Sequence, residues 1–116
     1  ANALVGAVRG RLGAELMTVM ILERVSPSVR GDLSRWMLEV KAGVFVGRIS
    51  QRVREAVWER CVSRSDGGTV IQIWRAANEQ GFDMKVHRPR GRIPYRHEGV
   101  WLVEVPNPNE EEEEGR

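Results

Sequence analysis

The densest group of reactive side chains lies in the segment Lys85–His97, which has the sequence KVHRPRGRIPYRH. Pro89, Gly91 and Pro94 predict that the segment stays outside regular structure. It carries five Lys and Arg residues and no acid. Each planar guanidinium group can bind two oxygens of one phosphate, so the segment predicts a grip on nucleic-acid backbone. The arginines expected to contact phosphate here are Arg88, Arg90 and Arg92.

A solvated loop, or one that pairs with the acidic tail of its own chain, is the alternative for this segment. Five cations without counter-charges repel one another unless a polyanion binds them, and this favours phosphate binding. Contacts to phosphate carry no information about base sequence. The segment therefore predicts binding to backbone and not to particular bases.

Two carboxylates are candidates for metal chemistry. Glu23 and Glu79 each stand at or just past the end of an expected strand, and adjacent strands would bring such ends together. Carboxylate oxygens bind Mg²⁺ or Mn²⁺, and a bound ion can activate water for phosphodiester cleavage. Glu23 and Glu79 are thus candidate catalytic residues, and Glu23 is a candidate metal ligand. Spacing alone favours ordinary surface residues or ion-pair partners.

Other chemistries lack their sequence motifs. His87 and His97 stand ten residues apart without a cysteine partner, which is not the spacing of zinc ligands. Cys61 lies on the expected apolar face of a helix, which favours a core position over a nucleophile. The chain contains neither GxxxxGK[ST] nor GxGxxG, so nothing predicts binding of a nucleoside triphosphate or a dinucleotide.

Charge is distributed unevenly along the 116 residues. Residues 1–109 hold 17 Lys and Arg against 11 Asp and Glu, a net charge of +6, and a run of five glutamates follows. A basic body with an acidic tail predicts a polyanionic partner for the body. With a single cysteine and no apolar run of 18 residues, we expect a cytoplasmic protein without a membrane span.

Hydrophobic patterning predicts three parts: an extension of unknown role over residues 1–16, one domain over 17–106, and a disordered acidic tail over 107–116. Within the domain we expect two amphipathic helices. The first begins at Ser26-Pro27 and continues to Val40, and the second begins after Ser50. The expected strands are Thr18–Glu23, Val44–Val46, Thr69–Ala76, Phe82–His87 and Val100–Val105.

This order of elements predicts an α+β, ferredoxin-like fold in which two helices pack on one face of an antiparallel sheet. The other face of the sheet would present Ile71, Ile73 and parts of residues 18–22. An uncovered apolar face needs a partner, so we expect a homodimer.

Several strings in the chain match a known family. They are ERVSPSVRG over residues 23–31, WMLEV over 36–40, KAGVFVG over 41–47, and the scattered positions Leu33, Ser50, Arg54, Glu55, Trp58, Glu59, Trp74, Gly81 and Phe82. The chain resembles the type I-E branch of CRISPR-associated protein two, the smaller spacer-acquisition subunit. The resemblance covers Thr18 to about Pro106, and the block from Trp36 to Gly47 is its most specific part.

The resemblance implies a ferredoxin-like homodimer that sits between two dimers of the CRISPR integrase subunit. The complex captures a short DNA duplex, the prespacer, and inserts it into the repeat array, while the small subunit acts as ruler and backbone clamp. Many relatives are described as metal-dependent endoribonucleases or DNases, with Glu23 and Glu79 at the corresponding positions. A nuclease is therefore the alternative function, and a toxin-like RNA interferase is a third.

The resemblance also implies roles for single residues. Arg30 and Arg52 align with phosphate-contacting positions of the two helices, and Arg92, with Arg90, aligns with paired arginines before the last strand. Ser28 and Asp32 stand where a relative has arginine, so the grip near the first helix is expected to be weaker. The residues expected to dock the integrase subunit are Val100, Trp101, Leu102, Val103, Glu104 and Val105.

Overall fold

A computed structural model describes residues 16–107 of the chain. The elements in chain order are β1 (Met17–Glu23), α2 (Pro27–Leu33), β2 (Leu38–Lys41), β3 (Val44–Arg48), α3 (Gln51–Ser63), β4 (Thr69–Arg75), β5 (Phe82–His87), β6 (Ile93–His97) and β7 (Val100–Glu104). The extension expected over residues 1–16 and the tail expected over 107–116 fall almost wholly outside the described part. Among residues 16–107, no helix is long and apolar enough to cross a membrane.

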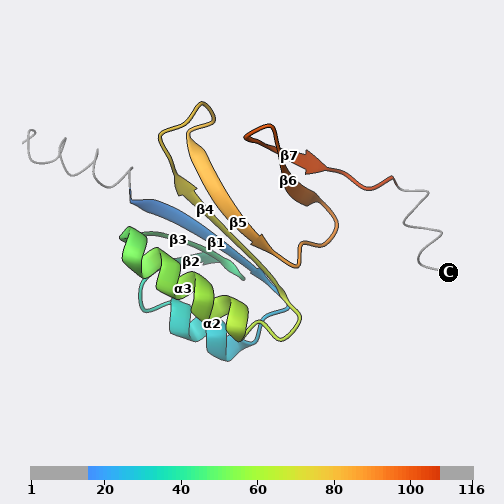
Figure 1. Cartoon of the computed structure of the whole chain (residues 1–116). Coiled ribbons are helices and arrows are strands. Elements are labelled where there is room, and N and C mark those ends of the chain that lie inside the picture. The colour runs from blue at the N-terminus through green and yellow to red at the C-terminus, as the bar shows by residue number, and fades with distance from the viewer. Residues whose placement is uncertain (1–15, 108–116) are drawn as a thin grey trace, which may run out of the picture.

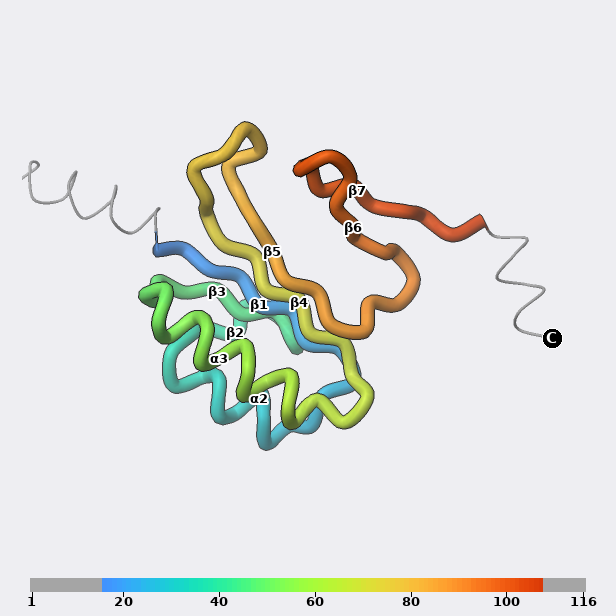
Figure 2. Tube along the Cα trace, in the orientation of Figure 1, coloured from blue at the N-terminus to red at the C-terminus, as the bar shows by residue number. Residues whose placement is uncertain are grey.

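Five strands form one antiparallel sheet in the order β2-β3-β1-β4-β5, and β6 pairs with β7 in a separate hairpin. Both helices lie on the same side of the large sheet, as Figures 1 and 2 show. This arrangement confirms the α+β class with two helices on an antiparallel sheet. It is compatible with the ferredoxin-like fold, in which two β-α-β units share one sheet.

The core lies between the helices and the sheet. Side chains along a strand alternate between its two faces, and in β1 the residues Thr18, Met20 and Leu22 are buried on the helix side. They pack with the buried faces of the helices, which include Val29 and Val57. Burial of such apolar side chains is the main term that holds the two layers together.

The expected first helix is too long. It ends at Leu33, and the segment Leu38–Lys41 is the edge strand β2, paired with β3. Met37 is buried whereas Leu38 is 67% exposed, an alternation typical of a strand. The apolar residues up to Val40 also have a spacing that suits a helix. Pairing with β3 therefore determined that residues 38–41 form a strand. Lys41-Ala42-Gly43 is accordingly a hairpin turn, with Gly43 at φ +80°.

The second helix confirms its predicted start. The Ser50 side chain accepts a hydrogen bond from the Val53 backbone N–H, which satisfies one of the free donors of the first turn. Val57 and Cys61 are buried on the apolar side of this helix. The strands expected near residues 69–76, 82–87 and 100–105 are present as β4, β5 and β7.

The expectation that Lys85–His97 lies outside regular structure is wrong for most of the segment. Its first residues end β5 and its last five form β6, so only residues 88–92 are a connecting loop. Pro94 lies opposite Val103 in the β6–β7 hairpin. Proline is tolerated there because each strand of a two-stranded sheet has a free edge.

Candidate nucleic-acid interface

The loop between β5 and β6 carries the three arginines that the sequence singled out. Arg88, Arg90 and Arg92 are all exposed. The loop is fixed at two points: the Thr69 hydroxyl donates to the carbonyl of Arg88 at 2.6 Å, and Arg90 Nη2 donates to the carbonyl of Gly67 at 2.8 Å. The loop therefore lies against the turn that joins α3 to β4.

The turn itself consists of residues 65–68 and is tightly packed. A Cβ atom on Gly68 would approach the carbonyl oxygens of Glu23 and Arg24 to 2.6 and 2.7 Å, so the position requires glycine. Directly before the turn stands Arg64, which is exposed at the end of α3. We call Arg64, Arg88, Arg90 and Arg92, grouped around this turn, the arginine edge.

Arg30 does not join the arginine edge. Its Nε donates to Glu39 Oε2 at 2.9 Å, and the same carboxylate accepts from the Gly43 backbone N–H at 2.9 Å. The hydrogen bond from Gly43, and then the guanidinium of Arg30, lower the pKa of Glu39 although its partial burial opposes the shift. Arg30 thus ties α2 to β2, a contact hidden from the sequence because β2 was expected to be helical.

Arg52 lies at the opposite end of α3 from the arginine edge. It is exposed in the first turn of the helix, twelve residues before Arg64. At 1.5 Å per residue the two positions are about 18 Å apart along the axis. Of the five arginines predicted to contact phosphate, the structure therefore brings Arg88, Arg90 and Arg92 together and leaves Arg30 and Arg52 elsewhere.

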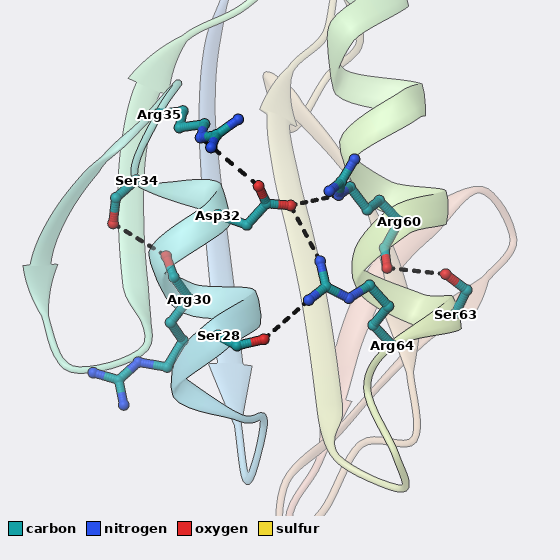
Figure 3. A network of polar contacts seen from close by, with 8 residues as sticks. All are labelled: Ser28, Arg30, Asp32, Ser34, Arg35, Arg60, Ser63 and Arg64. Carbon is teal, nitrogen blue, oxygen red and sulfur yellow. Dashed lines mark hydrogen bonds and ion pairs between the residues drawn. The ribbon is translucent and has the colours of Figure 1, made fainter.

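A cluster that the sequence did not predict joins the two helices (Figure 3). Asp32 on α2 forms ion pairs with three arginines. Arg60 contacts its Oδ2, Arg64 Nη1 reaches the same oxygen at 3.2 Å, and Arg35 lies 4.0 Å from Oδ1. Arg64 Nη2 also donates to the Ser28 hydroxyl at 3.0 Å. The sequence did contain one indication of this cluster: Arg60 and Arg64 are four residues apart, which places them on the same face of a helix.

The two candidate carboxylates do not meet. β1 and β4 are antiparallel, with Glu23 opposite Thr69, so Glu23 lies near the arginine edge while Glu79 follows the far end of β4. The expectation that adjacent strand ends would bring them together is wrong for a single chain, because it requires parallel strands. Within residues 16–107, no three His, Cys, Asp or Glu side chains are grouped to hold a metal ion. The carboxylates of one chain do not fit a shared Mg²⁺ or Mn²⁺ ion.

Comparison with protein families supplies the identity. The model of a family described as CRISPR-associated protein (Cas_Cas2CT1978) matches residues 17–102, which is most of the chain. The chain belongs to this family of CRISPR-associated proteins. The matched range includes both helices, the five-stranded sheet and the whole arginine edge.

In this CRISPR-associated protein the β6–β7 hairpin is fastened to the main sheet through Trp101. Its backbone N–H donates to Gln80 Oε1 at 2.8 Å, and Gln80 Nε2 donates to its carbonyl at 3.0 Å. The indole Nε1 donates to Asp83 Oδ1 at 2.8 Å. Burial would raise the pKa of Asp83, but the bonds from Trp101 and the Met84 N–H, with Arg96 and Arg54 nearby, lower it.

The strand expected to dock a partner is only partly available for one. Val100 and Trp101 are half-buried, Trp101 against its own chain, while the following residues are exposed. Leu102, Val103 and Val105 are 41%, 51% and 57% exposed. The outer half of this segment therefore presents apolar side chains to solvent.

Proposed function

We propose that this CRISPR-associated protein is a spacer-acquisition scaffold that binds duplex DNA by its phosphates and bridges dimers of the CRISPR integrase subunit. The arginine edge is the observation that supports the proposal most strongly. In the described part of the chain, Arg88, Arg90 and Arg92 form no ion pair with an acid, and two of them are anchored through their loop. Exposed guanidinium groups on a fixed loop suit phosphate oxygens.

Three of the four tryptophans are engaged within the chain and are not placed to stack on bases at the arginine edge, which favours a duplex over a single strand there. Single strands are held by aromatic rings on which bases stack. The guanidinium of Arg54 lies over the Trp74 ring, 4.3 Å from the ring centre, and the Lys85 ammonium lies 6.0 Å from the centre of the Trp58 ring. The Trp101 indole is hydrogen-bonded to Asp83 and fastens the hairpin. None of these three rings is presented at the arginine edge, whereas the fourth, Trp36, is 45% exposed and lies beside Asp32 and Arg60 on the helix face. The edge therefore offers charge and hydrogen-bond donors, which suit a stacked duplex.

The uncovered face of the sheet supports a homodimer. Val19 lies between Val46 and Ile73, and Ile21 lies beside Ile71 in the register of neighbouring strands. These side chains point away from the helices and form a continuous apolar surface. A second copy that covers this face would place two arginine edges in one particle, as a clamp on a duplex requires.

The proposal is tested by removing the loop arginines together. The triple variant carries Arg88→Ala, Arg90→Ala and Arg92→Ala in one chain. We expect it to bind two unrelated duplexes of equal length more weakly by the same factor, at least tenfold near physiological salt. Fluorescence anisotropy measures the affinities. The matched control is Arg75→Ala, an exposed arginine at the other end of the sheet.

Circular dichroism establishes that the triple variant is folded, since the loop lies outside the core. Two results would contradict the proposal. One is unchanged affinity in the folded triple variant, and the other is a loss confined to one of the two duplex sequences, which would mean that the arginines contact bases.

A further inference from the structure

We infer that the DNA-binding surface continues from the arginine edge onto the helix face, where Arg60 and Arg64 bind further phosphates of the same duplex. The inference rests on the proposed function and extends it to a second element of the structure. It concerns the cluster around Asp32. The family resemblance had implied weaker phosphate binding there, because Asp32 stands where a relative has arginine.

The cluster has more positive charge than its one carboxylate can balance. Three guanidinium groups meet a single Asp32, so the group keeps a net charge of about +2. A guanidinium has five N–H donors. Arg64 uses two nitrogens on Asp32 and Ser28, and Arg60 contacts Asp32 through Nε. Most of the donors remain available for phosphate oxygens.

Exposure shows which side of the cluster faces solvent. The side chain of Asp32 is 15% exposed, whereas those of Arg35, Arg60 and Arg64 are 75%, 54% and 38% exposed. Figure 3 shows Arg60 and Arg64 reaching Asp32 from α3 and Arg35 from the segment after α2, while Arg30 points away from it. Asp32 is therefore a positioning residue that holds the arginines between α2 and α3 while they remain open to solvent.

The cluster adjoins the arginine edge along the chain, because Arg64, whose guanidinium is held on Asp32 and Ser28, stands directly before the turn that the loop arginines contact. Arg64 is followed at once by the turn 65–68, and the carbonyl of Gly67 in that turn receives Arg90. Arg60 lies one helical turn before Arg64, about 6 Å along the axis. Charges on one DNA strand repeat every 3.4 Å or so of helix axis, so the arginines can reach different phosphates of one strand.

The acids nearest to these arginines in sequence do not pair with them. Glu59 precedes Arg60 and Asp66 follows Arg64 by two residues, and both are exposed. Neither forms an ion pair with an arginine within the described residues. Arg60 and Arg64 thus have Asp32 as their only carboxylate partner in this part of the chain.

The experiment compares Arg60→Gln with Arg64→Gln in one chain against the control Arg75→Gln. We expect the double variant to bind mixed-sequence duplex about tenfold more weakly near physiological salt. Its plot of log K against log salt should also be flatter by about 2, close to 0.9 for each lost phosphate contact. The control should leave both the affinity and the slope unchanged, because Arg75 makes no phosphate contact. The paired variant Arg60→Lys with Arg64→Lys should retain most of the salt dependence because the charges remain.

A different result is expected if Arg60 and Arg64 only hold the two helices together and do not contact DNA. In that case the double variant has a lower melting temperature but unchanged DNA affinity and slope, and the inference is overturned. If the loop variant loses binding while this one does not, the proposed function stands without the extension. If neither loses binding, the proposed function itself is wrong.

A second measurement uses the unaltered protein in case the double variant does not fold. Phenylglyoxal modifies exposed arginines, and mass spectrometry locates the modified positions. We expect bound duplex to protect Arg60 and Arg64 together with the arginine edge, but not Arg75. Equal modification of Arg60 and Arg64 with and without duplex would overturn the inference.

Discussion

At the scale of single residues, position in the fold decides what each charged group can do. Arg30 and Arg64 each pair with one carboxylate and are similarly exposed, at 32% and 38%, but Arg30 has Glu39 as its own partner whereas Arg64 shares Asp32 with two other arginines. The family resemblance implied a phosphate contact for Arg30 and none for Arg64. Glu39, the partner of Arg30, belongs to a strand that pairs only in the folded chain. The local sequence pattern therefore could not reveal the ion pair between Arg30 and Glu39.

Cys61 gives a prediction at this scale. The side chain is buried on the inner side of α3, and burial, together with the Asp32 carboxylate, raises the pKa of its thiol to about 11. A thiol with so high a pKa is protonated at pH 8 and reacts slowly. We expect Ellman's reagent at pH 8 to leave the native thiol almost unmodified and to react fully after denaturation. Rapid stoichiometric reaction of the folded protein would contradict this.

At the scale of elements, the β6–β7 hairpin depends on a small set of contacts centred on Trp101. The sequence predicted β7 but not β6, because Pro94 and the surrounding cations suggested a loop. Strand propensity is judged from side chains, whereas pairing with β7 is a property of the folded hairpin. The contacts of Gln80 and Asp83 with Trp101 join residues about 20 positions apart, which no local pattern encodes.

Asp83 gives a prediction for this element. We expect Asp83→Asn to loosen the hairpin, so that backbone amides of β6 and β7 exchange hydrogen about fivefold faster at pH 7. The loss is about 1 kcal/mol, less than a whole charge-assisted hydrogen bond, because the asparagine side-chain oxygen can still accept from the indole. Hydrogen-exchange mass spectrometry measures it, with the amides of β1 as the internal control. Unchanged exchange in the hairpin would show that Asp83 does not hold it.

The same carboxylate predicts a pH dependence. The pKa of Asp83 is lowered in the folded protein, so its stabilising effect is present above the ordinary pKa of 3.8 and is lost as pH falls below it. The tryptophan fluorescence, to which Trp101 contributes, should therefore change more in the acid range in the wild type than in Asp83→Asn. An identical acid transition in both proteins would contradict the assignment.

At the scale of the whole molecule, the proposed dimer depends on the half-buried apolar face of the sheet that lies opposite the helices. Periodicity of apolar residues was enough to predict two helices on one face and an apolar face on the other. The order of the strands was not predictable, because it depends on pairings between distant segments. That order is also what brings the β5–β6 loop beside the end of α3, and so it creates the arginine edge.

Ile71 tests the expected dimer. It lies near the middle of the open face, between Ile21 and Val86. A charge there would have to be buried in a dimer, so we expect Ile71→Glu to convert a dimer into a monomer at micromolar concentration. Light scattering measures the mass, with Ala77→Glu on an exposed loop as control. A monomeric wild type, or a dimeric Ile71→Glu, would contradict a dimer through this face.

The most direct test is the salt dependence of duplex binding. Affinity for one mixed-sequence duplex is measured by anisotropy between about 50 and 200 mM salt, for the wild type and for the chain without Arg88, Arg90 and Arg92. We expect log K to fall linearly with log salt, with a slope of about −4 for each chain in contact with the duplex in the wild type, and a slope flatter by about 3 for each chain in the variant. A nearly flat dependence in the wild type, or equal slopes in the two proteins, would show that these guanidinium groups do not hold the DNA backbone.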